Sequence, residues 1–154
     1  MFLKITVLLA LTITPLIGHS DEILLDDFRI HLLLEKSGSL SPDITEIDNF
    51  ISFNRQPFGK GIDSSERFYD FLILVKFKAD EESYVSASVA KLKVSKLYDG
   101  EVLLSTDFRK VYVGPEKETY KPIWVAGHGC YPLVVTVVGS NISISKELHF
   151  DCGE

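Results

Sequence analysis

The sequence predicts an all-β protein. Apolar and polar residues alternate with a period of two along most of residues 21–154, and β-branched and aromatic side chains are frequent there. No long stretch repeats its apolar residues with the period of roughly 3.6 residues that an amphipathic helix requires. Glycine, proline, serine and aspartate separate the alternating runs, as expected for turns between strands. These patterns favour antiparallel strands packed in layers.

Residues 1–20 have the composition of a cleaved secretory signal. Lys4 supplies a positive charge ahead of the apolar run 5–17, and small residues precede the expected cleavage point after Ser20. The apolar run is shorter than the roughly 20 residues needed to span a bilayer. We therefore expect a single domain over residues 21–154 with no membrane insertion after cleavage, in the periplasm or, as the alternative, secreted outside the cell.

The first two predicted strands lie at the start of this domain. Alternate residues of the first strand form an apolar face: Phe28, Ile30, Leu32 and Leu34. This strand ends at Ser37-Gly38-Ser39, which has the composition of a turn. A second, less regular strand is expected over residues 44–54, with one apolar face: Ile47, Ile51 and Phe53.

Residues 56–66 form the longest interruption of the alternating pattern. Two glycines and a proline within this segment predict a loop. Asp63 and Glu66 have the spacing of a capping box, so a single helical turn is expected there. Strong alternation resumes from Phe68 to Ala79 and is apolar on both faces midway, which predicts a strand in the centre of a sheet.

The C-terminal half predicts further strands and two hairpins. Residues 84–98 read as one long strand whose alternation shifts phase near Lys91, which indicates a β-bulge. Asp99-Gly100 predicts a hairpin with a type I′ turn. The remaining strands are expected at Phe108–Val113, Tyr120–Val125, Tyr131–Val138 and Ser143–Phe150. A total of about eight such strands is typical of an antiparallel, immunoglobulin-like β-sandwich.

The cysteines, Cys130 and Cys152, predict one disulfide, since an even number in an exported protein favours a bridge. A final hairpin centred on residue 141 places Cys130 directly opposite Cys152. The bridge would pin the C-terminal strand, which otherwise frays. The two cysteines lack the C-x-x-C spacing typical of redox motifs.

Charge and motifs exclude several classes of function. The chain has 22 acidic and 16 basic residues and a net charge of −6, so nucleic acids and anionic lipids are repelled, while a cationic protein partner is compatible. H-E-x-x-H and G-x-S-x-G motifs are missing from the sequence. We expect no catalytic residue, cofactor or metal. The alternative, a small hydrolase, requires His31, His128 or His149 to meet carboxylates in a pocket.

Four residues are candidates for partner binding: Arg55, Phe58, Lys60 and Trp124. Phe58 lies between the two basic residues in the long interrupted segment, where an exposed aromatic with a cationic rim would make an anchor. The alternative is that Phe58 packs on the core. Trp124 follows Pro122, which restricts that strand to a sheet edge or a strand start. If it is exposed, Trp124 marks a binding face.

These observations favour an exported, non-catalytic protein-binding module of the cell envelope, acting as an accessory subunit, an inhibitor or an immunity-type factor. The first alternative is a structural or adhesion subunit of pilus-like type, which would need an incomplete sandwich that accepts a donor strand. Asn141-Ile142-Ser143 forms a glycosylation sequon, which has meaning only in a eukaryotic secretory pathway.

Overall fold

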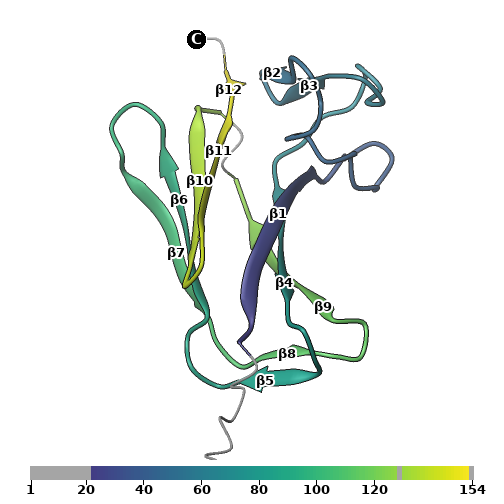
Figure 1. The fold of residues 1–154 in the computed structure, drawn as a ribbon. Coiled ribbons are helices and arrows are strands. Elements are labelled where there is room, and N and C mark those ends of the chain that lie inside the picture. Colours follow the sequence, from purple (N-terminus) through teal and green to yellow (C-terminus); the bar gives the residue numbers. More distant parts are fainter. Residues whose placement is uncertain (1–21, 128–129, 153–154) are drawn as a thin grey trace, which may run out of the picture.

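The computed structural model describes residues 22–127 and 130–152, and Figure 1 shows their course. This part of the chain contains twelve strands and no helix, which confirms the predicted all-β class. The expected signal and His128 lie outside the described residues. No described segment forms a helix long and apolar enough to cross a membrane. The strands are β1 (Leu24–Leu32), β2 (Ile51–Phe53), β3 (Gln56–Phe58), β4 (Phe71–Lys78), β5 (Ser83–Val85), β6 (Ala90–Lys96), β7 (Val102–Phe108), β8 (Val111–Val113), β9 (Glu118–Val125), β10 (Leu133–Gly139), β11 (Ser143–Leu148) and β12 (Phe150–Asp151).

Two larger and two smaller sheets make up the described fold. The larger sheets have the strand orders β1-β4-β9 and β11-β10-β6-β7, and their pairings are antiparallel. The smaller sheets, β12-β2-β3 and β5-β8, lie at opposite ends of the molecule in Figure 1. β4 lies between β1 and β9, which is the central position predicted from its two apolar faces.

A single buried cluster takes alternate residues from both larger sheets. On β4 and β10, the residues of one face are completely buried: Phe71, Ile73, Val75, Phe77, Leu133, Val135 and Val137. The period-two alternation in the sequence therefore directs one face of each strand into the cluster. Removal of this apolar surface from water is the main favourable contribution to folding.

The free edge of β1 is already hydrogen-bonded. The Ser41 amide donates to the Leu32 carbonyl, and the Ser41 hydroxyl oxygen accepts from the Leu32 amide, both at 2.9 Å. Ile30 is bonded in the same way, by the Ile44 amide at 2.9 Å and by the Asp43 carboxylate at 3.1 Å. An edge whose backbone groups are occupied cannot pair with a further strand.

Two side chains from the β10–β11 hairpin also bond β1. Asn141 Oδ1 accepts from the Leu25 amide at 3.2 Å, and Asn141 Nδ2 donates to the Leu25 carbonyl at 3.0 Å. Lys146 Nζ donates to the Phe28 carbonyl and lies 3.2 Å from an Asp27 carboxylate oxygen. These contacts join one larger sheet to the other.

The predicted strand over residues 44–54 is wrong for most of its length. Only Ile51–Phe53 (β2) is extended, whereas residues 44–49 form turns and bends. Asp43 accounts for the difference, because its Oδ1 accepts from the Thr45 amide at 3.0 Å and from the Thr45 hydroxyl at 2.8 Å. An aspartate that bonds the chain two residues on competes with an extended backbone.

The predicted loop over residues 56–66 is shorter than expected, because Gln56–Phe58 (β3) pairs with β2. At Asp63 the chain makes a single hydrogen-bonded turn that does not continue as a helix. The Ser65 amide donates to Asp63 Oδ1 at 2.8 Å, and the Glu66 amide donates to the Asp63 carbonyl at 3.0 Å. These bonds close a turn, and the part of the chain described by the structure has no helix at this point or elsewhere.

The single strand predicted over residues 84–98 is two strands in different sheets. β5 pairs with β8, whereas β6 pairs with β7 and β10. The phase shift near Lys91 therefore reflects a change of sheet and not a bulge, because residues 86–89 belong to neither strand and the buried positions are odd-numbered in β5 and mainly even-numbered in β6. The irregular pairing of β6 lies farther on, between Val94 and Ser95.

The Asp99-Gly100 hairpin is confirmed between β6 and β7, but the predicted type I′ turn is wrong. Gly100 has a φ of +71°, whereas the φ of Asp99 is negative. The Lys96 amide donates to the Glu101 carbonyl at 2.9 Å and encloses residues 97–100. This longer loop needs a positive φ only at its glycine.

Replacing Asn141 by alanine removes both bonds to Leu25. We expect the free energy of unfolding to fall by about 1 to 2 kcal/mol, since each net hydrogen bond contributes about 0.5 to 1.5 kcal/mol. Urea unfolding measures the change. The control is Ser143→Ala on the neighbouring exposed strand position, which should stay within about 0.5 kcal/mol of the parent. A loss at Asn141 no larger than that of the control would contradict the assigned role.

Candidate functional site

The β2–β3 hairpin contains a tight turn made without glycine. The two strands pair up to Phe53 and Gln56, which leaves Asn54 and Arg55 as the loop. Both loop residues have positive φ, 51° and 62°, as in a type I′ turn, whose twist matches that of the strands. Asparagine tolerates this conformation, but for most side chains it costs roughly 1–2 kcal/mol. Arg55 is therefore held in a strained backbone conformation.

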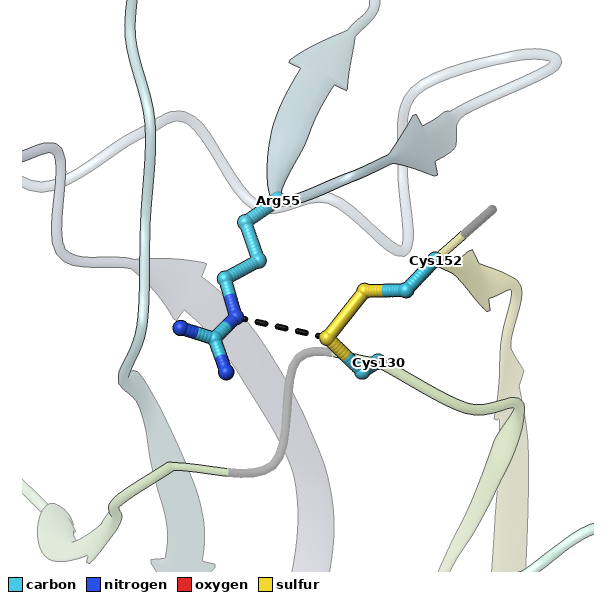
Figure 2. Close-up of a disulfide and its surroundings, with 3 residues drawn as sticks. All are labelled: Arg55, Cys130 and Cys152. Carbon is cyan, nitrogen blue, oxygen red and sulfur yellow. Dashed lines mark hydrogen bonds between the residues drawn. A yellow bond between two sulfur atoms is a disulfide. The ribbon is translucent and has the colours of Figure 1, made fainter. Parts of the chain in front are cut away.

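The side chain of Arg55 connects the hairpin to the rest of the protein. Its guanidinium carbon lies 4.0 Å from the centroid of the Tyr69 ring. Its Nε donates to Cys130 Sγ at 3.3 Å, as Figure 2 shows. Its carbonyl accepts from the Phe68 amide at 3.0 Å. Arg55 thus fixes the hairpin to the disulfide and to the segment before β4. The Arg55 guanidinium therefore contacts Tyr69 and Cys130 and does not form the cationic rim expected around Phe58.

The predicted disulfide between Cys130 and Cys152 is confirmed, with the Cα atoms 4.8 Å apart. The hairpin register that predicted it is wrong by one residue. β10 and β11 pair Val138 with Ser143, so the hairpin is centred between residues 140 and 141. A tight turn accounts for this register, because the Gly139 amide donates to the Ile142 carbonyl at 2.8 Å.

The β10–β11 register differs by one residue from the register that would pair Cys130 with Cys152. The extra residue is His149, which belongs to neither β11 nor β12. There it leaves β10 and pairs in parallel with β2, with Phe150 beside Ser52 and Asp151 beside Phe53. The Phe150 ring is completely buried, and its centroid lies 5.1 to 6.3 Å from three other rings: Phe50, Phe68 and Phe71. The disulfide and this aromatic cluster together hold β12 on β2.

The outer face of the β12-β2-β3 sheet is apolar and exposed. Its inner face contributes Ser52 and Pro57, which are buried. The outer face carries Ile51, Phe53 and Phe58, which are 54%, 49% and 38% exposed. Ile51 and Phe58 lie directly opposite each other in the register. Phe58 therefore points outward and does not pack on the core as a plug.

Tyr98, from the β6–β7 hairpin, extends this apolar face and is 85% exposed. It borders a hollow of about 330 Å³ together with Ile51, Phe53 and Pro132; the other lining residues are Ser52, His149, Phe150 and Asp151. We call Ile51, Phe53, Phe58 and Tyr98 the end surface. It belongs to the end of the molecule that carries β2 and β3 in Figure 1.

The charged groups around the hollow are mainly acidic. Asp151 lines it, and within the part of the chain that the structure describes no lysine or arginine does. His149 Nε2 lies 3.9 Å from a Glu147 carboxylate oxygen. The basic Lys96, next to the β6–β7 turn, is paired with Glu101 at 2.5 Å, and this contact raises the pKa of the lysine. The hollow therefore combines apolar walls with a negative border.

A second hollow, of about 390 Å³, lies beside β11 and also includes His149. Lys146 lines it, but this ammonium group is already bound by the Phe28 carbonyl, by Asp27 and by the Thr45 hydroxyl at 3.3 Å. Lys146 therefore serves to join the sheets rather than to receive a ligand.

The structure brings the four sequence-predicted residues to different surroundings. Phe58 belongs to the end surface, and Lys60 is exposed close behind it in the chain. Trp124 is 47% exposed on β9, in another sheet, where its Nε1 donates to Asp70 at 3.2 Å. The edge position predicted for its strand from Pro122 is confirmed, because β9 pairs only with β4 within its sheet.

Sequence reasoning missed three of the four residues of the end surface. Ile51 and Phe53 alternate as a core face would, and only the position of β12 and β3 around β2 turns that face outward. Asn54, a residue that favours positive φ, was the available signal for a short hairpin here. Tyr98 directly precedes the Asp99-Gly100 turn, and loop tips of this kind are commonly exposed.

The two described histidines lie in different parts of the fold. His31, on β1, has its Nδ1 2.9 Å from the Ser41 carbonyl, while His149 lies beside Glu147 at the end of β11. The third candidate, His128, lies outside the described residues. Over residues 22–127 and 130–152, no group of three or more histidine, cysteine, aspartate or glutamate side chains is arranged to hold a metal ion.

Neither a protein-family model nor a curated protein matches this chain. The exposed residues and their chemistry are therefore the basis for the function inferred below.

The positive φ of Arg55 leads to a comparison of two variants. Arg55→Ala and Arg55→Gly lose the same contacts with Tyr69 and Cys130, but only glycine relieves the backbone. We expect the glycine variant to be more stable than the alanine variant by about 0.5 to 1 kcal/mol, with both below the parent. Urea unfolding of the three proteins measures this. An alanine variant at least as stable as the glycine variant would show that the turn is not strained.

Removing the disulfide through Cys130→Ser with Cys152→Ser should lower the free energy of unfolding by about 3 kcal/mol, as expected for a closed loop of this length. Loss of β12 from β2 should also be visible locally. The Asn54 amide, which donates to the Asp151 carbonyl at 2.7 Å, should lose its protection from hydrogen exchange before the amides of β4 do. The same double variant in dithiothreitol is the control, since it has no bridge to lose. Unchanged protection at Asn54 would refute the role given to the bridge.

Proposed function

We propose that this chain is an exported, non-catalytic protein-binding module of the cell envelope, built as an immunoglobulin-like β-sandwich. In this proposal the β1-β4-β9 and β11-β10-β6-β7 sheets are the two layers. Support comes from the buried cluster, which takes residues from both sheets, and from the contacts of Asn141 and Lys146 with β1. Loops and small sheets at the ends of such a scaffold are common places for binding.

The end surface is the observation that carries the proposal. Exposed apolar side chains gathered on one surface mark an interaction site more often than scattered ones do. Aromatic residues dominate the binding energy of protein interfaces, and this surface has three: Phe53, Phe58 and Tyr98. The hairpin that carries two of them is fixed by Arg55 and by β12, so little conformational entropy is lost on binding.

The proposed compartment is the periplasm, with secretion as the alternative. The disulfide is consistent with a location outside the cytoplasm, because thiols are kept reduced in the cytosol. Within the envelope, the proposed role is that of an accessory subunit, an inhibitor or an immunity-type factor. The pilus-like alternative gains no support, since the edge of β1 is already occupied by Ser41, Asp43 and Ile44.

A photo-cross-linking amino acid at Phe58 tests this function in the exported protein within its native envelope. We expect one predominant protein adduct from this position and none from the matched position Tyr84, which is exposed on β5 at the other end. Equal adducts from both positions, or none from Phe58, would refute the proposal.

Variants of the same surface provide the quantitative test with the cross-linked partner in hand. Ile51→Ser with Phe53→Ser should weaken binding by about 30-fold or more, the effect expected for residues worth about 2 kcal/mol at an interface. Tyr84→Ser with Val138→Ser removes two side chains of similar exposure elsewhere and should leave affinity unchanged within about twofold. Similar losses in both pairs would contradict a localised interface.

A further inference from the structure

The hollow within the end surface has the size of a recognition pocket for side chains. Its volume of about 330 Å³ is at the lower end of the range of about 300 to 1,000 Å³ that is usual for ligand pockets. Ile51, Phe53 and Tyr98 give it apolar walls that are open to solvent on the outside. An apolar side chain of a partner would bury these walls and would itself leave water.

Carboxylates give the hollow its charge. Asp151 lies beside Phe53 in the parallel pairing of β12 with β2, and both side chains are exposed on the outer face. Asp99 is exposed next to Tyr98, while Glu147 lies 3.9 Å from His149 and lines the neighbouring hollow beside β11. His149 also lines the hollow, but no lysine or arginine of residues 22–127 and 130–152 does. The border therefore attracts cations.

The backbone of Asp151 is held on both sides. Asp151 stands between Phe150, which is completely buried, and Cys152, which is in the disulfide. Its carbonyl accepts from the Asn54 amide at 2.7 Å. Because this segment is rigid, pairing of a cation with the carboxylate costs little conformational entropy of the backbone.

We infer that the partner at the end surface presents a basic segment with one protruding apolar side chain. The apolar side chain enters the hollow between Phe53 and Tyr98, and a flanking lysine or arginine side chain pairs with Asp151. This inference rests on the proposed function, because it names the chemistry of the partner at that same surface. The net charge of −6 adds long-range attraction for such a segment.

Other occupants fit the border less well. A second copy of this chain has the same negative charge and would bring Asp151 toward other carboxylates if the two end surfaces met. An anionic membrane is repelled for the same reason. An apolar but uncharged segment would fill the hollow and leave Asp151 without a cation.

Three synthetic peptides test the inference with the oxidised, exported chain. The first has one leucine between two pairs of lysines, the second has serine in place of the leucine, and the third has glutamates in place of the lysines. We expect the first to perturb the amide signals of Phe53, Tyr98 and Asp151 and to bind at least about fivefold more tightly than the others, with affinity falling as salt rises. Equal binding of the three peptides, or no perturbation at these amides, would overturn the inference.

Charge variants give the matched comparison. Asp151→Lys should weaken binding of the leucine–lysine peptide by about 10-fold and reduce its salt dependence, whereas Asp80→Lys, the same charge change in the turn after β4, should change affinity by less than about twofold. Asp151→Asn keeps the size of the side chain and should weaken binding by about threefold, which guards against a folding defect of the lysine variant. Equal effects at Asp151 and Asp80 would overturn a local role.

The cross-link from Phe58 separates the two proposals. An adduct whose attached segment contains lysine or arginine around an apolar residue supports both. An adduct on a neutral or acidic segment overturns the basic-partner inference and leaves the proposed function standing. Absence of an adduct refutes the proposed function, while the peptide titration still decides whether the hollow selects basic apolar segments.

Discussion

The position of β12 on β2 is the constraint on which the candidate site depends. Two independent contacts hold this short strand: the Cys130–Cys152 disulfide follows it, and the buried Phe150 ring anchors it among three other phenylalanines. Without β12, β2 and β3 would form an isolated two-stranded hairpin, which is marginally stable in water. With it, the inner face is closed over Ser52 and the outer face is fixed as an exposed surface.

The free edge of β1 and the end of the molecule that carries Phe53 and Tyr98 differ in how far their groups are already bonded. The free edge of β1 is occupied by backbone and side-chain hydrogen bonds, which prevents pairing with other chains. The end with Phe53 and Tyr98 remains apolar and open, and the turn beside it holds Arg55 in a strained conformation. Strain and exposed apolar surface both reduce stability, and such features concentrate where a protein binds or reacts.

Several elements could be predicted because the residue pattern that indicates them lies within the element and is compatible with only one structure. β4 alternates strongly and is apolar on both faces, so its central position followed from its own residues. The predictions for other elements were wrong where contacts with a distant segment determine the local structure. The phase shift near Lys91 is compatible with a bulge or with a change of sheet, and only the pairing of β5 with β8 distinguishes them. Asp43 has the composition of an ordinary turn residue, but its hydrogen bonds to Ile30 and Thr45 prevent the extended backbone that was predicted from residue 44 onward.

By itself, the sequence determined the all-β class, the buried face of the strongly alternating strands and the pairing of the only two cysteines. Alternation and a single possible disulfide are properties of the chain alone. The tertiary structure decided which face of Ile51–Phe53 meets solvent. A strand of three residues shows the same alternation whichever face is buried, and here its neighbours make the choice. β12 comes from the far end of the chain and brings Asp151 beside Phe53, so the apolar surface and its negative border exist only in the folded protein.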